Sequence, residues 1–361
     1  MKGNTKICIV GNMLGRNPDW VTTQGQVLAD KLPGEGFDVI SVSSKTNRFT
    51  RLAEIIYTLV ARRRSIDVVV LEVYSGLYFV IAEVASLLCR VFRLPLIMVL
   101  HGGELPNFYR RHPRRTAWVL NRADRLVAPS SFLAHEFEKA GFPVRVIPNI
   151  IDLHDSTFRE RGSIAPNLLW MRSFHPIYDP EMAIKVFAEV KKRHAAALLT
   201  MAGKDKGLEE TVRKLAAELG VANAVRFPGF LNAAKKSAEF DSADIFLNTN
   251  KIDNMPVSVV EACSFGVPVV ATRVGGIPYL LRDRMDALLV NSGDVKQMAD
   301  AICELLDSPG LVRELSRNGR LLAKRSDWHN VKHDWIRVFG ECSVVRGSST
   351  APRAEDTVAT N

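Results

Sequence analysis

Short apolar runs alternate with amphipathic stretches along the whole chain, with six such runs in each half. This alternation is typical of parallel sheets covered by helices. We therefore predict an α/β protein made of two Rossmann-like, doubly wound domains of similar size, which face each other across a cleft. The expected strands of the first half are Ile7–Val10, Asp38–Val42, Val68–Glu72, Leu96–Leu100, Leu126–Pro129 and Val144–Ile147. Those of the second half are Leu168–Met171, Ala197–Met201, Ala224–Phe227, Ile245–Asn248, Pro268–Thr272 and Ala287–Val290.

The same pattern predicts the domain boundaries. The first domain should span residues 1–150, a polar linker residues 151–166, and the second domain residues 167–327. Apolar residues at helical spacing predict a last helix over residues 328–342, which either crosses back onto the first domain or packs on its own domain. The polar residues 343–361 are expected to be disordered. Amphipathic helices are predicted over Pro180–His194, Leu208–Leu219 and Val295–Leu306.

Composition narrows the class of protein. A chain of 361 residues with 47% hydrophobic residues can build two cores. Its five cysteines lie far apart without a CxxC pair, which favours a reducing compartment and predicts neither disulfides nor a metal site. Charged residues and Pro95 interrupt the longest apolar stretch, residues 76–100, so it reads as a buried helix and strand rather than a membrane span. No signal peptide is expected, and the predicted location is cytoplasmic.

The net charge of +9 suits either an anionic membrane or simple solubility. Basic runs at Arg62–Arg64 and Arg110–Arg115, near Phe108, Tyr109 and Trp118, form either a peripheral contact for anionic lipid or a solvated helix face. No nucleic-acid-binding motif accompanies the charge, so no nucleic-acid partner is expected.

Two Rossmann-like domains suggest a nucleotide in the cleft, near the carboxyl ends of the strands. The turn after the first strand, GNMLG, does not fit the G-x-G-x-x-G pattern of dinucleotide binding, and a P-loop is absent. Ordinary dehydrogenases and P-loop ATPases are therefore excluded.

The segment DNMPVSVVEACSFGVPVVATRVGG, residues 253–276, carries the strongest chemical signal. Pro256 suits a first helical position, which leaves the amides of Val257 and Ser258 free at a helix N-terminus that favours a diphosphate. Glu261 follows about one turn later, where a carboxylate can accept hydrogen bonds from ribose hydroxyls. Gly275 and Gly276 allow a backbone to pass close to a ligand. The alternative is an ordinary helix–strand unit with acidic surface residues.

This segment resembles the E-x7-E region of the retaining family 4 (group 1) glycosyltransferases, which have a GT-B fold. Glu261 followed by Ala262 matches the second acid, whereas Asp253 stands in place of the first. The resemblance implies that Asp253 contacts hydroxyls of the donor sugar and that Gly229 and Phe230 lie beside the nucleotide base. A bland tight turn is the alternative at Gly229.

Arg172 matches the arginine of the pair that grips the diphosphate in this family, and a guanidinium can bind phosphate with two hydrogen bonds. The lysine of that pair is missing, and its place falls at Tyr178. Lys204 and Lys206 either supply the missing charge or are solvated loop lysines. A surface ion pair is the alternative for Arg172.

The first domain should supply the acceptor side. His101 directly follows a strand in LIMVLHGGELP, and the family often has a histidine there, near donor sugar and acceptor. Glu104 either binds the acceptor hydroxyl or caps the following turn. Gly15 and Gly25, in and just after the first loop, are candidates for approaching the donor, and Thr22 or Thr23 should cap the next helix.

The sequence thus predicts a retaining glycosyltransferase that moves a sugar from a UDP- or GDP-sugar to an acceptor hydroxyl, on a saccharide or lipid-linked saccharide, in glycan, polysaccharide or glycolipid biosynthesis. No cofactor and no metal are expected. Two alternatives stay open: a nucleotide-sugar epimerase of the same architecture, and a catalytically inactive subunit that binds sugar nucleotides.

Overall fold

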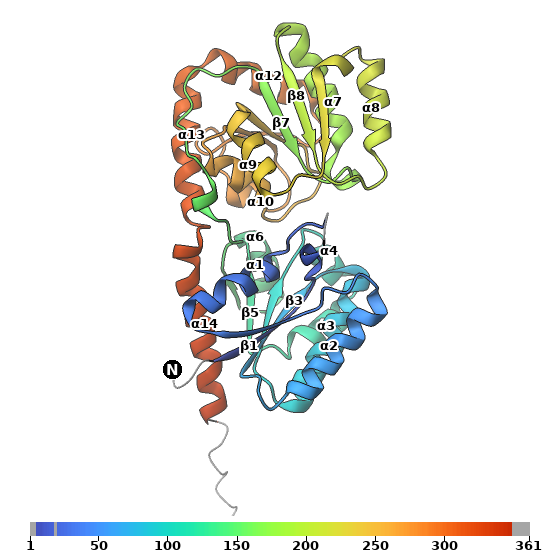
Figure 1. Ribbon diagram of the computed structural model, residues 1–361, viewed down its shortest axis with the longest axis vertical. Helices are drawn as coiled ribbons and strands as arrows, with labels where there is room; N and C mark the ends of the chain where they lie inside the picture. Colours follow the sequence, from blue (N-terminus) through green and yellow to red (C-terminus); the bar gives the residue numbers. More distant parts are fainter. Residues whose placement is uncertain (1–4, 18–19, 349–361) are drawn as a thin grey trace, which may run out of the picture.

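Each half of the chain folds around a six-stranded sheet in which every pair of neighbouring strands is parallel. The computed structural model describes residues 5–17 and 20–348. Helices cover both faces of each sheet, and the two domains lie one above the other in Figure 1. The predicted α/β class with two Rossmann-like domains is confirmed, and the predicted strand ends are correct to within two residues.

The N-terminal sheet has the strand order β2-β1-β3-β4-β5-β6 and the C-terminal sheet the order β12-β11-β10-β7-β8-β9. The strands of the first sheet are β1 Lys6–Val10, β2 Asp38–Val42, β3 Val68–Val73, β4 Leu96–Leu100, β5 Arg125–Ala128 and β6 Val144–Val146. Those of the second sheet are β7 Asn167–Met171, β8 Leu198–Ala202, β9 Val225–Gly229, β10 Ile245–Asn248, β11 Val269–Thr272 and β12 Leu288–Val290.

The helices of the N-terminal half are α1 Gln24–Lys31, α2 Arg48–Arg62, α3 Phe79–Phe92, α4 Leu105–Arg111, α5 Pro113–Leu120 and α6 Ser131–Glu138. Those that follow are α7 Pro180–Arg193, α8 Glu209–Glu218, α9 Ala233–Ser242, α10 Val257–Ser264, α11 Ile277–Leu280, α12 Val295–Asp307, α13 Pro309–Lys324 and α14 Trp328–Ser348. Short 3-10 turns lie at η1 Leu14–Arg16, η2 Leu32–Glu35, η3 Gly76–Tyr78, η4 Leu153–Asp155, η5 Pro176–Tyr178 and η6 Ala222–Ala224.

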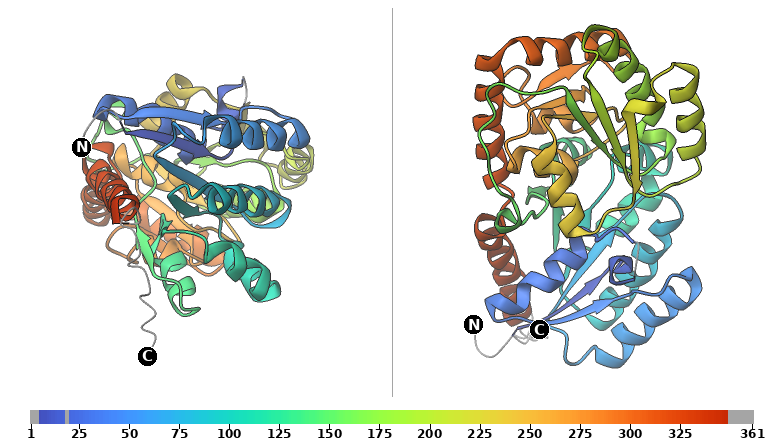
Figure 2. Two further views of the ribbon diagram at one scale, coloured as in Figure 1. Left: turned by 90° about the horizontal axis from the view of Figure 1, so that it is seen from below. Right: turned by 45° about the horizontal axis from the view of Figure 1, so that its top comes forward.

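The strands are nearly continuous apolar runs because each sheet is covered on both faces. All six residues of β3, VVVLEV, are buried, and Glu72 is the single charged residue among them. Helix starts are fixed by side-chain caps: Thr23, for example, accepts the amide of Gln26 at the start of α1, and Ser130 accepts the amide of Leu133 at the start of α6. The carboxyl ends of the strands of both sheets point into the space between the domains (Figures 1 and 2).

The last helix, α14, belongs to the C-terminal half in sequence but packs on the N-terminal domain. Val331, Trp335, Val338 and Phe339 join one core cluster with residues of β1, β3 and β4. Polar contacts fix its two ends, because Lys332 binds Glu35 and Glu341 binds both Arg125 and Arg145.

The end of the chain differs from the expectation in part. Helix α14 extends to Ser348, six residues into the stretch 343–361 that was expected to be disordered. The rest of that stretch, residues 349–361, lies outside the described residues.

Removing the ring that α14 buries should destabilise the N-terminal domain. Trp335 is 5% exposed and stacks on Phe339 at 5.6 Å between ring centroids. We expect Trp335→Ala to lower the free energy of unfolding by about 3–5 kcal/mol, measured by urea denaturation. Tyr57→Ala is the control, because that ring is 73% exposed and should change stability little. Equal effects of the two substitutions would mean that α14 contributes no packing energy.

Candidate functional site

The residues predicted for the site lie where the carboxyl ends of the two sheets meet. The contacts that join the domains at this place include the following two. The hydroxyl of Ser130, before α6, donates to the side-chain oxygen of Asn254, after β10. The backbone at Gly103, after β4, passes so close that a Cβ there would lie 3.0 Å from the carbonyl oxygen of Asp253. The loops carrying His101 and Asp253 are therefore brought face to face.

The loop that carries Asp253 is held by backbone contacts that only glycine permits. A Cβ on Gly275 would lie 2.1 Å from the carbonyl oxygen of Asp253, and one on Gly276 would lie 1.9 Å from that of Asn254. The amide of Gly276 donates to the carbonyl of Asp253 at 3.0 Å. The close approach expected at this glycine pair is thus an approach of the chain to its own loop.

Arg172, directly after β7, forms an ion pair with Asp253. The carboxylate also accepts hydrogen bonds from the side chain of Asn250 and from the amide of Asn254. The guanidinium carbon of Arg172 lies 4.3 Å from the ring centroid of Tyr178, a cation–π contact. The structure therefore brings Arg172, Asp253 and Tyr178 into one cluster, although the first two were expected to act on different parts of a donor.

Helix α10 begins one residue later than predicted, because Pro256 is its N-cap with a ψ of 112°. The amides of Val259 and Val260 already bond to the carbonyl of Pro256, and those of Val257 and Ser258 have no partner among the described residues. The hydroxyl oxygen of Ser258 is buried and also lacks a partner there. This helix N-terminus offers donors to an anion, as the sequence suggested.

Glu261 lies about one turn into α10 and forms an ion pair with Lys236 of α9. The carboxylate is one-fifth exposed, so the pair lies at the rim of the site. Sequence reasoning did not identify Lys236, which is separated from Glu261 by strand β10 and the loops on either side of it.

The remaining donor-side candidates are spread along the loops of both domains. Gly229 ends β9 with a φ of 72°, and Phe230 after it is 36% exposed. The ammonium of Lys204 lies 4.5 Å from the ring centroid of Trp20, in the opposite domain, whereas Lys206 is exposed. Gly15 packs against the backbone, where a Cβ would lie 2.6 Å from the Cα of Thr22.

The N-terminal domain contains a buried histidine beside a buried acid. His101 is 8% exposed, and its Nε2 lies 3.4 Å from a carboxylate oxygen of Glu72, without hydrogen-bond geometry. Tyr74 stacks on the imidazole at 4.9 Å between centroids. Burial and the negative charge of Glu72 raise the pKa of the Tyr74 hydroxyl well above its usual value. The histidine is thus enclosed between an aromatic ring and an acid.

Glu72 also organises the first loop of the domain. Its carboxylate accepts the amide of Gly25 at 2.7 Å and the amide of Asn12 at 3.2 Å. A Cβ on Gly11 would lie 2.2 Å from one carboxylate oxygen, and one on Gly25 would lie 2.4 Å from the other. These glycines are required because the acid fills the space beside them.

Glu104 lies just before α4, where it accepts a hydrogen bond from Asn107 at 3.3 Å and makes no side-chain cap of the helix. It is half-buried and close in sequence to His101. No group of three or more metal-binding side chains occurs within residues 5–17 and 20–348.

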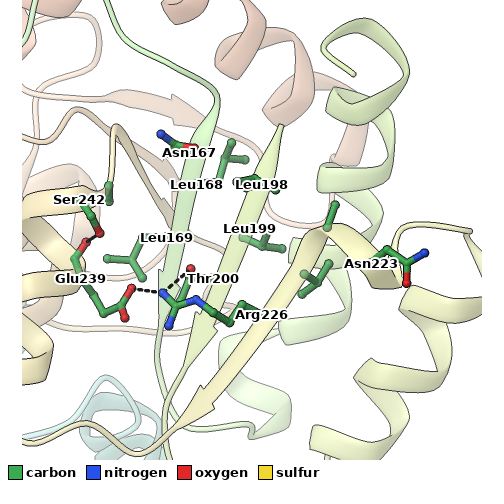
Figure 3. Close-up of a pocket in the computed structure, with 13 residues that line it drawn as sticks. Asn167, Leu168, Leu169, Leu198, Leu199, Thr200, Asn223, Arg226, Glu239 and Ser242 are labelled. Atoms are coloured by element: carbon green, nitrogen blue, oxygen red, sulfur yellow. Dashed lines mark hydrogen bonds and ion pairs between the residues drawn. The ribbon is translucent and has the colours of Figure 1, made fainter. Parts of the chain in front are cut away.

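A cavity of about 410 Å³ lies elsewhere (Figure 3). It runs along the beginnings of β7, β8 and β9, whereas the predicted site lies at the ends of these strands. Leu198 and Leu199 line it beside the ion pair of Arg226 and Glu239. It contains none of the residues that the sequence pointed to.

Two known families match different halves of the chain and together cover most of it. The family described as "Glycosyl transferases group 1" matches residues 165–322, and "Glycosyltransferase Family 4" matches residues 34–155. The chain belongs to the family 4, group 1 glycosyltransferases, and its fold is GT-B.

Similar proteins agree with this assignment. The chain is 27% identical over 314 residues to D-inositol 3-phosphate glycosyltransferase of Acidothermus cellulolyticus, covering 78% of this chain and 70% of that protein. The D-inositol 3-phosphate glycosyltransferase of Actinosynnema mirum is 26% identical over 244 residues. This match covers 62% of this chain and 58% of that protein, so the match to some relatives is partial.

Solved structures share the fold. Sucrose-phosphate synthase from Thermosynechococcus elongatus superposes with a TM-score of 0.79 at 15% identity, over 95% of this chain and all of that one. HepE from Anabaena, solved in complex with UDP and glucose, superposes with a TM-score of 0.73 at 16% identity, over 94% of this chain and all of that one.

Glu72 is one of the residues of this glycosyltransferase that the sequence analysis missed. One signal was present, because an acid within an otherwise apolar strand is rarely buried without a partner. Its partners, the glycine loop and His101, come from three other segments and cannot be paired with it by spacing. The same holds for Tyr74, whose ring lies against His101.

Crowding around Glu72 gives a stability prediction. Gly25→Ala places a methyl group against the buried carboxylate, and we expect it to cost about 1–3 kcal/mol of unfolding free energy despite the better helix propensity of alanine. Gly34→Ala is the matched control, since a Cβ at Gly34 meets nothing within 4 Å and should be neutral or slightly stabilising. Thermal or urea unfolding measures both. If the two variants had the same stability, Glu72 would not fill the space beside α1.

Proposed function

We propose that the protein transfers a sugar from a nucleotide-diphosphate sugar to an acceptor hydroxyl with retention of anomeric configuration. The observation that carries the proposal is the facing arrangement of two loops. On one side lie the free N-terminus of α10 and the Arg172–Asp253 pair, and on the other lies His101 beside Glu72. The first side suits a diphosphate and a sugar, and the second suits an acceptor.

The donor side offers positive charge and unpaired donors to a leaving diphosphate. Preorganised donors of this kind stabilise the charge that develops on a leaving group. Arg172 has a buried Nε without a partner among the described residues, and it pairs with Asp253 in the loop that leads to the free amides of Val257 and Ser258. UDP is the favoured nucleotide because HepE, which has the same fold, was solved with UDP; a GDP-sugar remains an outcome of the test.

Donor binding would change the partner of Arg172. In the structure the guanidinium neutralises Asp253, and a diphosphate carries more negative charge than one carboxylate. The guanidinium would turn to the phosphate, where its planar fork can make two hydrogen bonds. Asp253 would then be free to accept hydrogen bonds from hydroxyls of the donor sugar.

The proposed reaction needs no carboxylate nucleophile. The bond from the anomeric carbon to the phosphate oxygen breaks, and the acceptor oxygen bonds to the same face of that carbon. The acceptor proton passes to the leaving phosphate oxygen. In this scheme His101 borders the donor sugar and acceptor, and Tyr74 and Glu72 restrict the orientation of its ring.

The deciding experiment is incubation of the purified protein with UDP- and GDP-sugars and a panel of hydroxyl acceptors. Release of free UDP or GDP coupled to a glycosylated product supports transfer, and proton NMR of the product gives its anomeric configuration. An inverted product contradicts retention. Binding of nucleotide sugars without any product would favour the inactive subunit, and a changed sugar still attached to the nucleotide would favour an epimerase.

Loss of Arg172 should cut turnover. Arg172→Ala is expected to lower kcat about 10²–10³-fold, and Arg172→Lys should not restore it because the planar fork is lost. The substitution also leaves Asp253 without its cation. Asp253→Asn and the double variant therefore complete a double-mutant cycle, which separates the two effects on kcat. Near-wild-type turnover of Arg172→Ala would place the diphosphate elsewhere, first near Lys204.

Glu261 should hold the nucleotide rather than take part in the chemical step. Glu261→Gln is expected to weaken binding by about 1.5–3 kcal/mol, the usual contribution of a hydrogen bond to a charged group. Glu239→Gln is the control, because Glu239 is also paired with a cation but lies beside the cavity outside the cleft. Calorimetry with UDP or GDP measures both. Equal affinities of the two variants would remove Glu261 from the site.

A further inference from the structure

The outer face of the N-terminal domain, formed by α2, α3 and α5, exposes an apolar surface that no other part of residues 5–17 and 20–348 covers. We define this α2–α3–α5 face by seven exposed side chains: Phe49, Tyr57, Leu77, Val80, Leu87, Val91 and Trp118. We propose that it binds the surface of an anionic lipid bilayer. This proposal does not depend on the reaction proposed above.

The three helices present their outer residues to the same side. Each of them packs its inner residues, such as Ile55, Ala85 and Val119, into one core cluster on one face of the first sheet. Helix α2 packs against α3, and α3 packs against α5. The residues on the opposite side of the helices therefore form one continuous surface, on the lower right of Figure 1.

Along η3 and α3 the exposed apolar residues form a stripe. Leu77, Val80, Leu87 and Val91 repeat at helical spacing, and their exposed fractions are 78%, 39%, 44% and 64%. Such a stripe normally faces a core, and here it faces outward. An exposed apolar surface of this kind marks an interaction site.

The centre of the face carries almost no free charge. From Leu52 to Ala61 the only charged residue is Glu54, which binds Ser43. From Leu77 to Cys89 it is Glu83, whose two carboxylate oxygens bind Arg115 at 2.6 and 2.9 Å. Both acids are therefore satisfied within the domain.

Arginines are concentrated in the segments that carry this apolar centre; Arg51 among them is buried, and Arg110 and Arg115 form ion pairs. Residues 48–64, 77–93 and 105–122, which contain α2 to α5, include twelve arginines, two glutamates and no lysine. The chain has 48 basic and 39 acidic residues, which leaves 36 basic and 37 acidic residues elsewhere. The net positive charge of the protein thus comes from the three segments that carry this face.

This combination favours an anionic bilayer over other occupants. Arginine binds lipid phosphate with two hydrogen bonds, and tyrosine and tryptophan prefer the bilayer interface. A second copy on the same face would bring the arginines of both copies together, which repels. Nucleic acid would use the arginines but not Leu87 and Val91, which cannot stack on bases as aromatic rings do.

The anchoring residues differ from those suggested by the sequence. Phe108 and Tyr109 are half-buried against the core, so they cannot insert into lipid. Trp118 remains, 53% exposed, with the guanidinium of Arg122 at 3.3 Å from a ring centroid. Among the described residues no helix is long and apolar enough to cross a membrane, so the contact would be at the interface.

The face reaches the cleft at the start of α3. Tyr78, beside Leu77, contacts Tyr74 at 6.4 Å between ring centroids, and Tyr74 stacks on His101. A bilayer bound to this face would therefore lie on the side of the domain where Tyr78 and Tyr74 connect the face to His101.

Vesicle flotation with the full chain tests the proposal. We expect the protein to float with vesicles of equal parts phosphatidylcholine and phosphatidylglycerol, less so as salt increases, and not with pure phosphatidylcholine. Leu87→Gln with Val91→Gln should abolish flotation. Leu219→Gln with Leu321→Gln, at positions 43% and 57% exposed in the other domain, is the matched control and should float normally.

A second pair of variants tests the charge. Arg62→Gln with Arg64→Gln should lower the partition coefficient about 30-fold, since each arginine near an anionic surface contributes roughly fivefold. Arg313→Gln with Arg317→Gln removes the same charge from α13 and should change it by less than about threefold. Far-UV circular dichroism confirms that every variant is folded.

Three results would overturn the proposal. The first is a wild-type protein that floats with neither kind of vesicle. The second is an equal loss of flotation in the test and control variants. The third is a dimer in sedimentation velocity that Leu87→Gln with Val91→Gln dissociates, which would assign the face to a second copy of the chain.

Discussion

The relation between the two domains depends on the burial of α14. The first sheet has an apolar face that its own segment of chain leaves open, and residues more than 200 positions further along the chain, Trp335 and Phe339, close it. Because α13 ends at Lys324 within the C-terminal domain and α14 begins at Trp328, only three residues separate the two anchors. This short connection keeps the domains close, so that the carboxyl ends of both sheets border one space.

Within that space, close backbone packing fixes the position of the charged groups. Gly103 of one domain and Gly275 and Gly276 of the other lie against the loop of Asp253 and Asn254. On the other side Gly11 and Gly25 enclose Glu72, which lies beside His101. The glycines of this site are therefore explained by close packing of the chain against itself. The sequence alone cannot distinguish such packing from the close approach of a ligand.

Much of the fold was predictable because local patterns determine it. Buried parallel strands are apolar runs, and these runs fixed all twelve strands to within two residues. The sequence also indicated His101, Arg172 and Asp253, since each follows a strand directly or lies in a recognisable segment. It could not indicate that Arg172 binds Asp253 or that Lys236 binds Glu261, because the first pair joins loops after two different strands and the second joins two different helices. Helix packing likewise decided that Phe108 is half-buried whereas Leu87 is exposed.

The acids and bases of the candidate site are arranged in pairs, so that each charge is compensated by its neighbour. Each donor-side acid has its own cation, Arg172 for Asp253 and Lys236 for Glu261, so no carboxylate is left uncompensated in a partly buried place. A nucleotide-diphosphate sugar brings its own negative charge and its own hydroxyls, and it can replace both halves of such a pair at once. The phosphate takes the guanidinium, and the sugar hydroxyls take the carboxylate. Under the proposed function, the Arg172–Asp253 pair therefore occupies the place of the donor, and its exchange links phosphate binding to recognition of the sugar.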